Sequence, residues 1–196
     1  MIPILILAAG SSSRMRGGDK LREDVAGVPL LRRQTQMAIA TQQPVFVALA
    51  PDNPWHLEMI ADLDATLLVI TDAAEGISAT LRGAIPQLPQ GGALMIMLAD
   101  LAALTTSDLM AVLDARTHFP DHLIWRGATS DRKAGHPLLI DDSLRPEFER
   151  LQGDAGGQSI LRPLQSQTHL VVFADQRARL DLDTPEDWSA WRSTFS

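Results

Sequence analysis

The sequence contains no cysteine, which excludes a disulfide framework and a thiolate metal site. Aromatic residues make up 5% of the chain and no long basic stretch is present, which argues against a nucleic-acid partner. No apolar run approaches the roughly 18–20 residues of a membrane span, and the first residues lack the basic segment of a secretory signal. We therefore expect a soluble cytoplasmic protein with no nucleic-acid partner and no membrane partner.

The length and composition favour one domain. The chain has 196 residues, of which 45% are hydrophobic, enough to bury a substantial core. No internal repeat, low-complexity segment or dividing linker is evident. We expect a single domain over residues 1–196. From about Leu123 onward, the predicted strands are shorter and lie around glycine-containing stretches.

Apolar runs recur along the chain and predict strands. The first, residues 2–7, is apolar without alternation, as expected for a strand that is buried on both faces of a parallel sheet. The other runs are residues 45–49, 66–70, 93–99, 123–125, 138–140 and 169–173.

Helical spacing of apolar residues separates most of these runs, at 29–40, 77–85 and 107–116. Thr105 with Asp108, and Thr184 with Asp187, are spaced as capping boxes, and Pro185 suits a first helical position. The alternation of strand and helix predicts an α/β fold with a mostly parallel sheet. Ligands of such sheets bind beyond the carboxyl ends of the strands, where the strand order reverses.

The segment after the first run combines small residues with a local excess of positive charge. Its small residues, Ala8-Ala9-Gly10, let backbone N–H groups approach an oxyanion. The chain carries a net charge of -7, yet four of its 17 lysine and arginine residues lie in this loop: Arg14, Arg16, Lys20 and Arg22. A cationic loop at this place predicts a polyphosphate site. The alternative is an exposed, solvated loop.

Two common phosphate motifs do not fit this loop. No Gly-Lys-Ser/Thr follows the strand and no Gly-x-Gly-x-x-Gly is present, which excludes a typical P-loop NTPase or Rossmann dehydrogenase. The chain instead resembles the molybdenum-cofactor nucleotidyltransferases, the MobA-like NTP transferase family. The segments that carry the resemblance are Leu7-Ala8-Ala9-Gly10-Ser11-Ser12-Ser13-Arg14-Met15 and Asp19-Lys20-Leu21.

The resemblance implies roles for this loop. Arg14 and Lys20 match the catalytic cations that hold the β- and γ-phosphates of a nucleoside triphosphate. The implied nucleotide-binding residues are Leu7, Ala8, Ala9, Gly10 and Ser11. Arg16 departs from the family, which usually has glycine there. If that position needs a positive φ, Arg16 costs strain of about 1 kcal/mol.

Two carboxylates are candidate metal ligands. Asp100 directly follows the most apolar run and so lies at the carboxyl edge of the sheet, although a turn or helix-entry role is an alternative. Mg²⁺ bound with a nucleotide takes one or two carboxylates together with phosphate oxygens and waters. The resemblance implies that Asp100 and Asp183 bind this metal, although Leu101-Ala102 departs from the family pattern. Asp181, two positions before Asp183 on an extended segment, points to the same face.

Further matches extend the resemblance along the chain. Residues 76–82 resemble a segment of the cytidylyltransferase branch and imply nucleotide contacts at Gly76, Ser78 and Leu81, although an ordinary helix start also explains them. Two later segments, at Gly135-His136-Pro137 and Gly153-Asp154-Ala155, imply that His136 and Asp154 bind the acceptor. A structural role for a lone histidine is the alternative at His136. Gln158 replaces the usual arginine, which weakens a cationic contact there.

The resemblance as a whole implies a three-layer α/β/α, Rossmann-like (GT-A-like) fold, with a nucleotide-binding half at about residues 1–120 and an acceptor-binding half at about 121–196. The implied reaction is Mg²⁺-dependent transfer of a nucleoside monophosphate onto a phosphorylated acceptor, with release of pyrophosphate. Within the family Ala8-Ala9-Gly10 favours CTP over GTP, which points to the molybdopterin cytidylyltransferase branch.

The corresponding partners are a molybdopterin-type acceptor and an apo molybdenum hydroxylase. Two alternatives stay open. One is a cytidylyl- or sugar-phosphate nucleotidyltransferase with another acceptor. The other is a non-catalytic module that binds a nucleotide or molybdopterin and escorts it.

Overall fold

A computed structural model describes residues 1–153 and 156–195, and its main sheet confirms the α/β expectation. The seven strands have the order β5-β4-β1-β6-β8-β7-β9. In this sheet β8 is antiparallel to β6 and β7, and the remaining neighbours are parallel. The bounds are β1 Ile4–Leu7, β4 Val45–Leu49, β5 Thr66–Val69, β6 Leu94–Leu98, β7 Ile124–Ala128, β8 Ala134–Ile140 and β9 Thr168–Val172.

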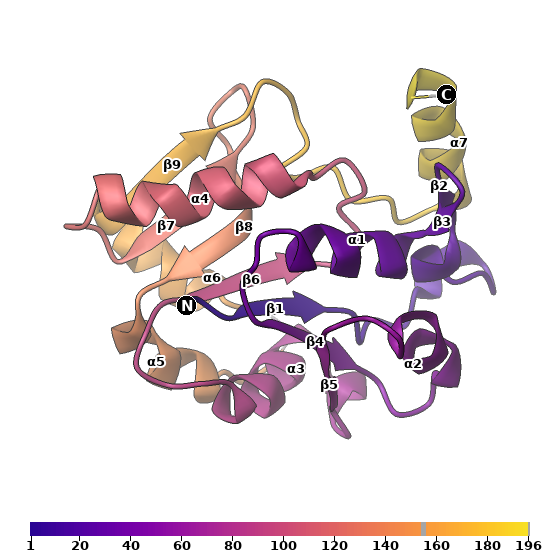
Figure 1. Cartoon of the computed structure of the whole chain (residues 1–196), viewed down its shortest axis with the longest axis horizontal. Coiled ribbons are helices and arrows are strands. Elements are labelled where there is room, and N and C mark those ends of the chain that lie inside the picture. The colour runs from indigo at the N-terminus through magenta and orange to yellow at the C-terminus, as the bar shows by residue number, and fades with distance from the viewer. Residues whose placement is uncertain (154–155, 196) are drawn as a thin grey trace.

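Helices cover both faces of this sheet, with α1 and α4 on one side and α3 and α5 on the other (Figure 1). Each face of the sheet has its own hydrophobic core. The helices of the core on the α1 side are α1 Leu30–Ile39, α2 Pro54–Ile60, α4 Thr106–His118 and α7 Pro185–Phe195. The second core contains α3 Ile77–Ala84, α5 Arg145–Glu149 and α6 Gln158–Leu161. A small hairpin of β2 Asp24–Val25 and β3 Val28–Pro29 lies beside α7.

The short helices α2, α5 and α6 were not anticipated, because 7, 5 and 4 residues carry little periodicity.

Strand β1 shows why its run is apolar without alternation. Ile4 and Ile6 point into the core beneath α1 and α4, whereas Leu5 and Leu7 point into the core beneath α3. All four are at most 9% exposed. A central strand of a three-layer fold has no solvent face, so both sets of side chains must be apolar.

The strand order reverses at β1. The chain passes from β1 to β4 and β5 on one side, and then returns to β6 on the other side of β1. The backbone N–H of Ala99 donates to the carbonyl of Leu7 at 3.1 Å, so the carboxyl ends of β1 and β6 lie side by side. This is the ligand-binding place in open α/β sheets. The segments that leave it contain Lys20 and Asp100.

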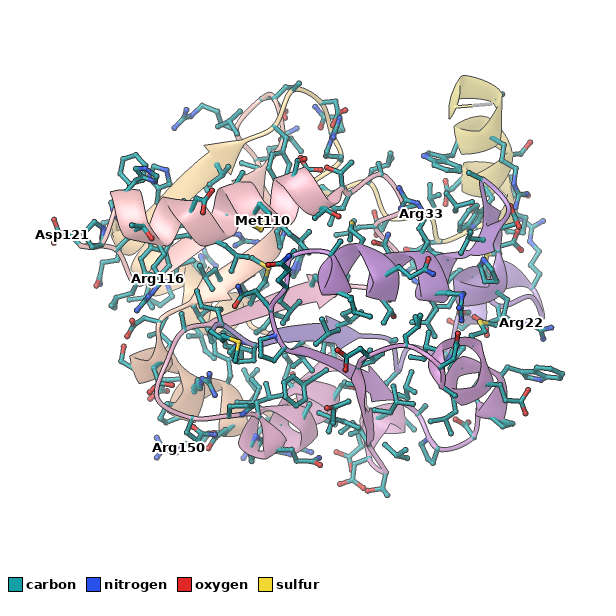
Figure 2. All side chains as sticks on the ribbon, viewed as in Figure 1. Arg22, Arg33, Met110, Arg116, Asp121 and Arg150 are labelled. Atoms are coloured by element: carbon teal, nitrogen blue, oxygen red, sulfur yellow. The ribbon has the colours of Figure 1, made fainter. Side chains whose placement is uncertain are left out.

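Charged side chains lie mostly at the periphery. Figure 2 shows Arg22, Asp121 and Arg150 projecting from the edges of the molecule, and all three are exposed. Within the described residues, no helix is both long and apolar enough to cross a bilayer.

The capping box at the start of α4 provides a test of the local structure. The Thr105 hydroxyl accepts from the N–H of Asp108 at 3.3 Å, and the Asp108 carboxylate accepts from the N–H of Thr105 at 2.9 Å. Thr105→Ala removes the cap and should lower the free energy of unfolding, measured by urea denaturation, by about 1 kcal/mol. Thr105→Ser keeps the hydroxyl and is the matched control. Equal loss in both variants would count against the cap.

Candidate active site

A cavity of about 1140 Å³ lies at the carboxyl ends of β1 and β6, and is called here the nucleotide cavity. It brings together segments that are far apart in the sequence. Ten of the residues that the sequence singles out line it: Leu7, Ala8, Ala9, Gly10, Ser11, Arg14, Lys20, Gly76, Asp100 and Asp183. The loop after β1 therefore faces both carboxylates: the adjacency of β1 and β6 brings Asp100 there, and the chain after β9 brings Asp183.

The ammonium of Lys20 joins the two carboxylates. Its Nζ lies 2.6 Å from Oδ2 of Asp100 and 2.7 Å from Oδ1 of Asp183. These three side chains are 14%, 15% and 10% exposed, so water screens the contacts poorly. Burial alone would lower the pKa of Lys20, but the two carboxylates outweigh it and raise this pKa. Lys20 is therefore charged at any physiological pH.

Arg14 occupies the other oxygen of Asp183, at 2.7 Å from Nη1 to Oδ2. Unlike Lys20, the Arg14 side chain is 69% exposed, so most of its guanidinium faces open solvent. Guanidinium presents five N–H donors in a planar fork, which suits bidentate binding of phosphate. Arg14 therefore has donors to offer a ligand while one remains on Asp183.

Buried residues fix the loop that delivers these cations. Met15 and Leu21 are 5% and 2% exposed and pack into the core. Between them the chain turns through Arg16, whose φ of 51° and ψ of 42° place it in the left-handed region that favours glycine. Arg16 also pairs with Glu186 at 2.9 Å, but both side chains are largely exposed, so this pair contributes little.

A second cluster holds the backbone next to Lys20. The Asp19 carboxylate accepts from the N–H of Leu21 at 3.0 Å and lies 2.7 Å from Nε2 of His56. Asn53 donates to the same carboxylate at 3.1 Å. His56 is buried, and both His56 and Asn53 belong to the start of α2 and line the nucleotide cavity. This cluster attaches the Lys20 loop to α2.

The MobA-like NTP transferase domain matches residues 4–170. The chain belongs to the MobA-like NTP transferase family. It is therefore an enzyme of the nucleotidyltransferase class. It is also 28% identical to a "Probable molybdenum cofactor guanylyltransferase" of Natronomonas pharaonis, with 98% of this chain and 97% of that protein covered.

Solved structures of low sequence identity share the fold. Rv0371c of Mycobacterium tuberculosis has a TM-score of 0.84 at 22% identity, over 98% of each chain. A manganese complex of the same protein has a TM-score of 0.75 at 21% identity, over 96% of each chain. The three-layer nucleotidyltransferase fold expected from the sequence is confirmed.

Two residues expected at the nucleotide do not line the nucleotide cavity. Gly76 takes the N-cap position of α3, and Ile77 and Thr80 face the cavity. Leu81 is 3% exposed and packs into the core beneath α3, and Ser78 is 1% exposed. The helical repeat explains this, because one face of α3 points to the cavity while the other faces the core.

Of the two acceptor-side residues, His136 lines a second cavity of about 830 Å³, called here the acceptor cavity. Burial and the nearby Arg126 lower the pKa of His136 to about 4, so its ring is neutral at neutral pH. Its Nδ1 lies 3.3 Å from the carbonyl of Ile96, which is compatible with a structural role. Asp154 lies outside the described residues.

The carboxylates of the nucleotide cavity fit a divalent cation that arrives with a nucleotide. Oδ1 of Asp100 is buried and has no hydrogen-bond partner within the described parts of the chain. Burial and the charges of Asp183 and Asp100 raise the pKa of Asp181, which places a third carboxylate nearby. Residues 1–153 and 156–195 hold no group of three or more His, Cys, Asp or Glu side chains arranged for a metal. One or two carboxylates with phosphate oxygens suffice for Mg²⁺.

Three cavity residues were not among the residues predicted from the sequence: His56 and Asn53 at the nucleotide cavity and Arg126 at the acceptor cavity. Asn53-Pro54 is a recognisable helix start, and an arginine within the apolar segment Ile124-Trp125-Arg126 is unusual. Those were the available signals.

The Asp19 cluster generates a prediction on acid stability. Burial alone would raise the pKa of Asp19, but His56, the Leu21 N–H and Asn53 lower it to about 2. The folded pKa lies below the ordinary value of 3.8, so the carboxylate stabilises the fold above that pH and loses this effect as the pH falls toward 2. Asp19→Asn should therefore lower the free energy of unfolding by about 2 kcal/mol near neutral pH.

Urea denaturation at a series of pH values measures this effect. The difference between wild type and Asp19→Asn should shrink as the pH falls from about 5 to about 3. Asp114→Asn, on the exposed side of α4, is the control for loss of a carboxylate. A difference that stays constant over this pH range would show that Asp19 does not act through its charge.

Proposed function

We propose that this chain transfers CMP from CTP to a phosphorylated acceptor of the molybdopterin type, with Mg²⁺ as cofactor and pyrophosphate as the second product. One observation carries the proposal. Lys20 lies 2.6 and 2.7 Å from Asp100 and Asp183, within a cavity at the carboxyl ends of β1 and β6. A cation between two carboxylates at this edge is suited to a metal-bound triphosphate.

The proposed reaction requires positioning more than covalent catalysis. An oxygen of the acceptor phosphate attacks the α-phosphorus of CTP, a new P–O bond forms, and the bond to the β-phosphate oxygen breaks in line. Pyrophosphate leaves with that electron pair. Because the attacking phosphate is already ionised, no general base is needed, and catalysis depends on neutralising charge on the phosphate oxygens.

The side chains have donors available for these tasks. The Lys20 ammonium has three N–H donors, and two of them are used on Asp100 and Asp183. The third is available to a phosphate oxygen, and Arg14 adds the exposed part of its guanidinium. Arg14 and Lys20 thus hold the β- and γ-phosphates. Asp100 and Asp183 would hold Mg²⁺, which would supply positive charge to offset the charge of the phosphates.

The choice of base rests on the small residues of the first loop. Ala9 lines the nucleotide cavity, and a side chain at this position crowds a purine, which favours CTP. The name of the Natronomonas pharaonis relative supports GTP as the second candidate. Calorimetric titration with CTP, GTP and ATP, each with and without Mg²⁺, decides between them. The proposal expects Mg²⁺-dependent binding that is tightest for CTP.

The acceptor proposal draws on the same relative, whose name specifies the molybdenum cofactor. An apo molybdenum hydroxylase is the proposed recipient of the product. Another phosphorylated acceptor, as in sugar-phosphate nucleotidyltransferases, would leave the nucleotide chemistry unchanged. Turnover assayed with each class of phosphorylated acceptor separates these two proposals.

Substitutions in the nucleotide cavity test the assigned roles. Lys20→Ala or Asp100→Asn should reduce Mg²⁺-dependent release of pyrophosphate from CTP and acceptor by about 100-fold or more, the scale of losing one charge-stabilising contact. Arg22→Ala is the matched control. Arg22 belongs to the same loop but lies over the Trp55 ring at 4.7 Å instead of lining the cavity. Unchanged turnover in both cavity variants would refute these roles.

A further inference from the structure

The acceptor cavity carries a surplus of positive charge. One carboxylate, that of Asp181, lines it, together with four cationic side chains: Arg126, Lys133, Arg162 and Arg179. Lys133 pairs with Asp131 at 2.9 Å. Among residues 1–153 and 156–195, no carboxylate lies within ion-pair distance of the three arginines. This contrasts with a chain whose net charge is -7.

Arg126 is the most unusual of these cations because it is buried. It lies in the middle of β7 and is 7% exposed, and its Nε donates to the carbonyl of Gly135 at 2.9 Å. Burial and the nearby charge of Arg179 lower the pKa of Arg126 to about 10, so it remains charged at neutral pH. A neutral carbonyl offsets little of the cost of burying a charge. An anionic ligand in the cavity would offset it directly.

The fold holds Arg179 close to Arg126. The N–H of His136 donates to the carbonyl of Ala178 at 2.8 Å, which attaches this segment to β8. A Cβ on Gly135 would lie 2.1 Å from that carbonyl oxygen and 2.8 Å from Cγ of Arg179, so only glycine permits the approach. Two like charges are thereby kept near each other. Such an arrangement is unfavourable unless an anion binds between them.

We propose that the acceptor cavity binds a phosphate monoester group of the acceptor, with Arg126 as the buried contact and Arg162 and Arg179 at the exposed rim. Guanidinium groups suit this ligand because their paired N–H donors match the geometry of phosphate. Leu98 and Asp181 line both cavities, so a phosphate held here lies next to the nucleotide. The identification of this anion with the acceptor rests on the proposed function, whereas anion binding itself rests on the charge of the cavity.

Calorimetric titration of the whole chain with inorganic phosphate and with phenyl phosphate tests this site. Arg126→Met should weaken binding of both by about 10- to 100-fold, the scale of a hydrogen-bonded charge contact. Arg126→Lys should weaken it less because it keeps the charge. Arg22→Ala, which removes an arginine that lines neither cavity, is the matched control and should leave phosphate binding unchanged. In wild type, the Nε–H NMR signal of Arg126 should shift on addition of phosphate.

Three results would overturn the site: no phosphate binding by wild type, equal binding by wild type and Arg126→Met, or the same loss of phosphate binding in Arg22→Ala as in Arg126→Met. If Arg126→Met does not fold, Arg126→Lys and the exposed variant Arg179→Gln decide, and unchanged phosphate affinity in both contradicts the site. The proposed function fails separately, if wild type binds neither CTP nor GTP. These failures are distinguishable because each ligand is titrated on its own.

Discussion

The active-site geometry depends on one ion-pair bridge, in which the ammonium of Lys20 contacts both Asp100 and Asp183. Lys20 and Asp100 are 80 positions apart in the sequence, and Lys20 and Asp183 are 163 positions apart. Two nearby carboxylates repel each other unless a cation lies between them. The bridge therefore holds three segments in one place: the loop after β1, the end of β6, and the chain that precedes α7. The first two segments are neighbours because the strand order reverses at β1, whereas the third returns to them from β9 at the edge of the sheet.

The two cavities differ in whether their cationic side chains are paired with carboxylates, and this difference suits the proposed transfer between two anions. In the nucleotide cavity the cations Lys20 and Arg14 are balanced by carboxylates that fit a divalent metal. In the acceptor cavity the arginines lack carboxylate partners within the described residues. The cavities meet at Leu98 and Asp181. In the proposed function, these charges would offset the mutual repulsion of two polyanionic substrates where they meet.

The sequence predicted the sheet well because its strands are apolar runs whose burial leaves a direct pattern. It also placed Lys20, Asp100 and Asp183 at one edge, since strand ends and a family motif locate residues without side-chain coordinates. It could not predict His56, because α2 is too short to show periodicity and its contact with Asp19 is set by tertiary packing. The sequence also could not tell which residues of α3 line the cavity, because the rotation of that helix decides which side chains face it.

The proposed function requires that Lys20, Asp100 and Asp183 surround one metal-bound nucleotide. A crystal structure of the chain with Mn²⁺ and a non-hydrolysable CTP analogue tests it most directly, since anomalous scattering locates the manganese. We expect one manganese peak bonded to Asp100, Asp183 and an α-phosphate oxygen, with Lys20 and Arg14 on the outer phosphates. A triphosphate bound elsewhere, or a manganese that contacts neither carboxylate, would contradict it.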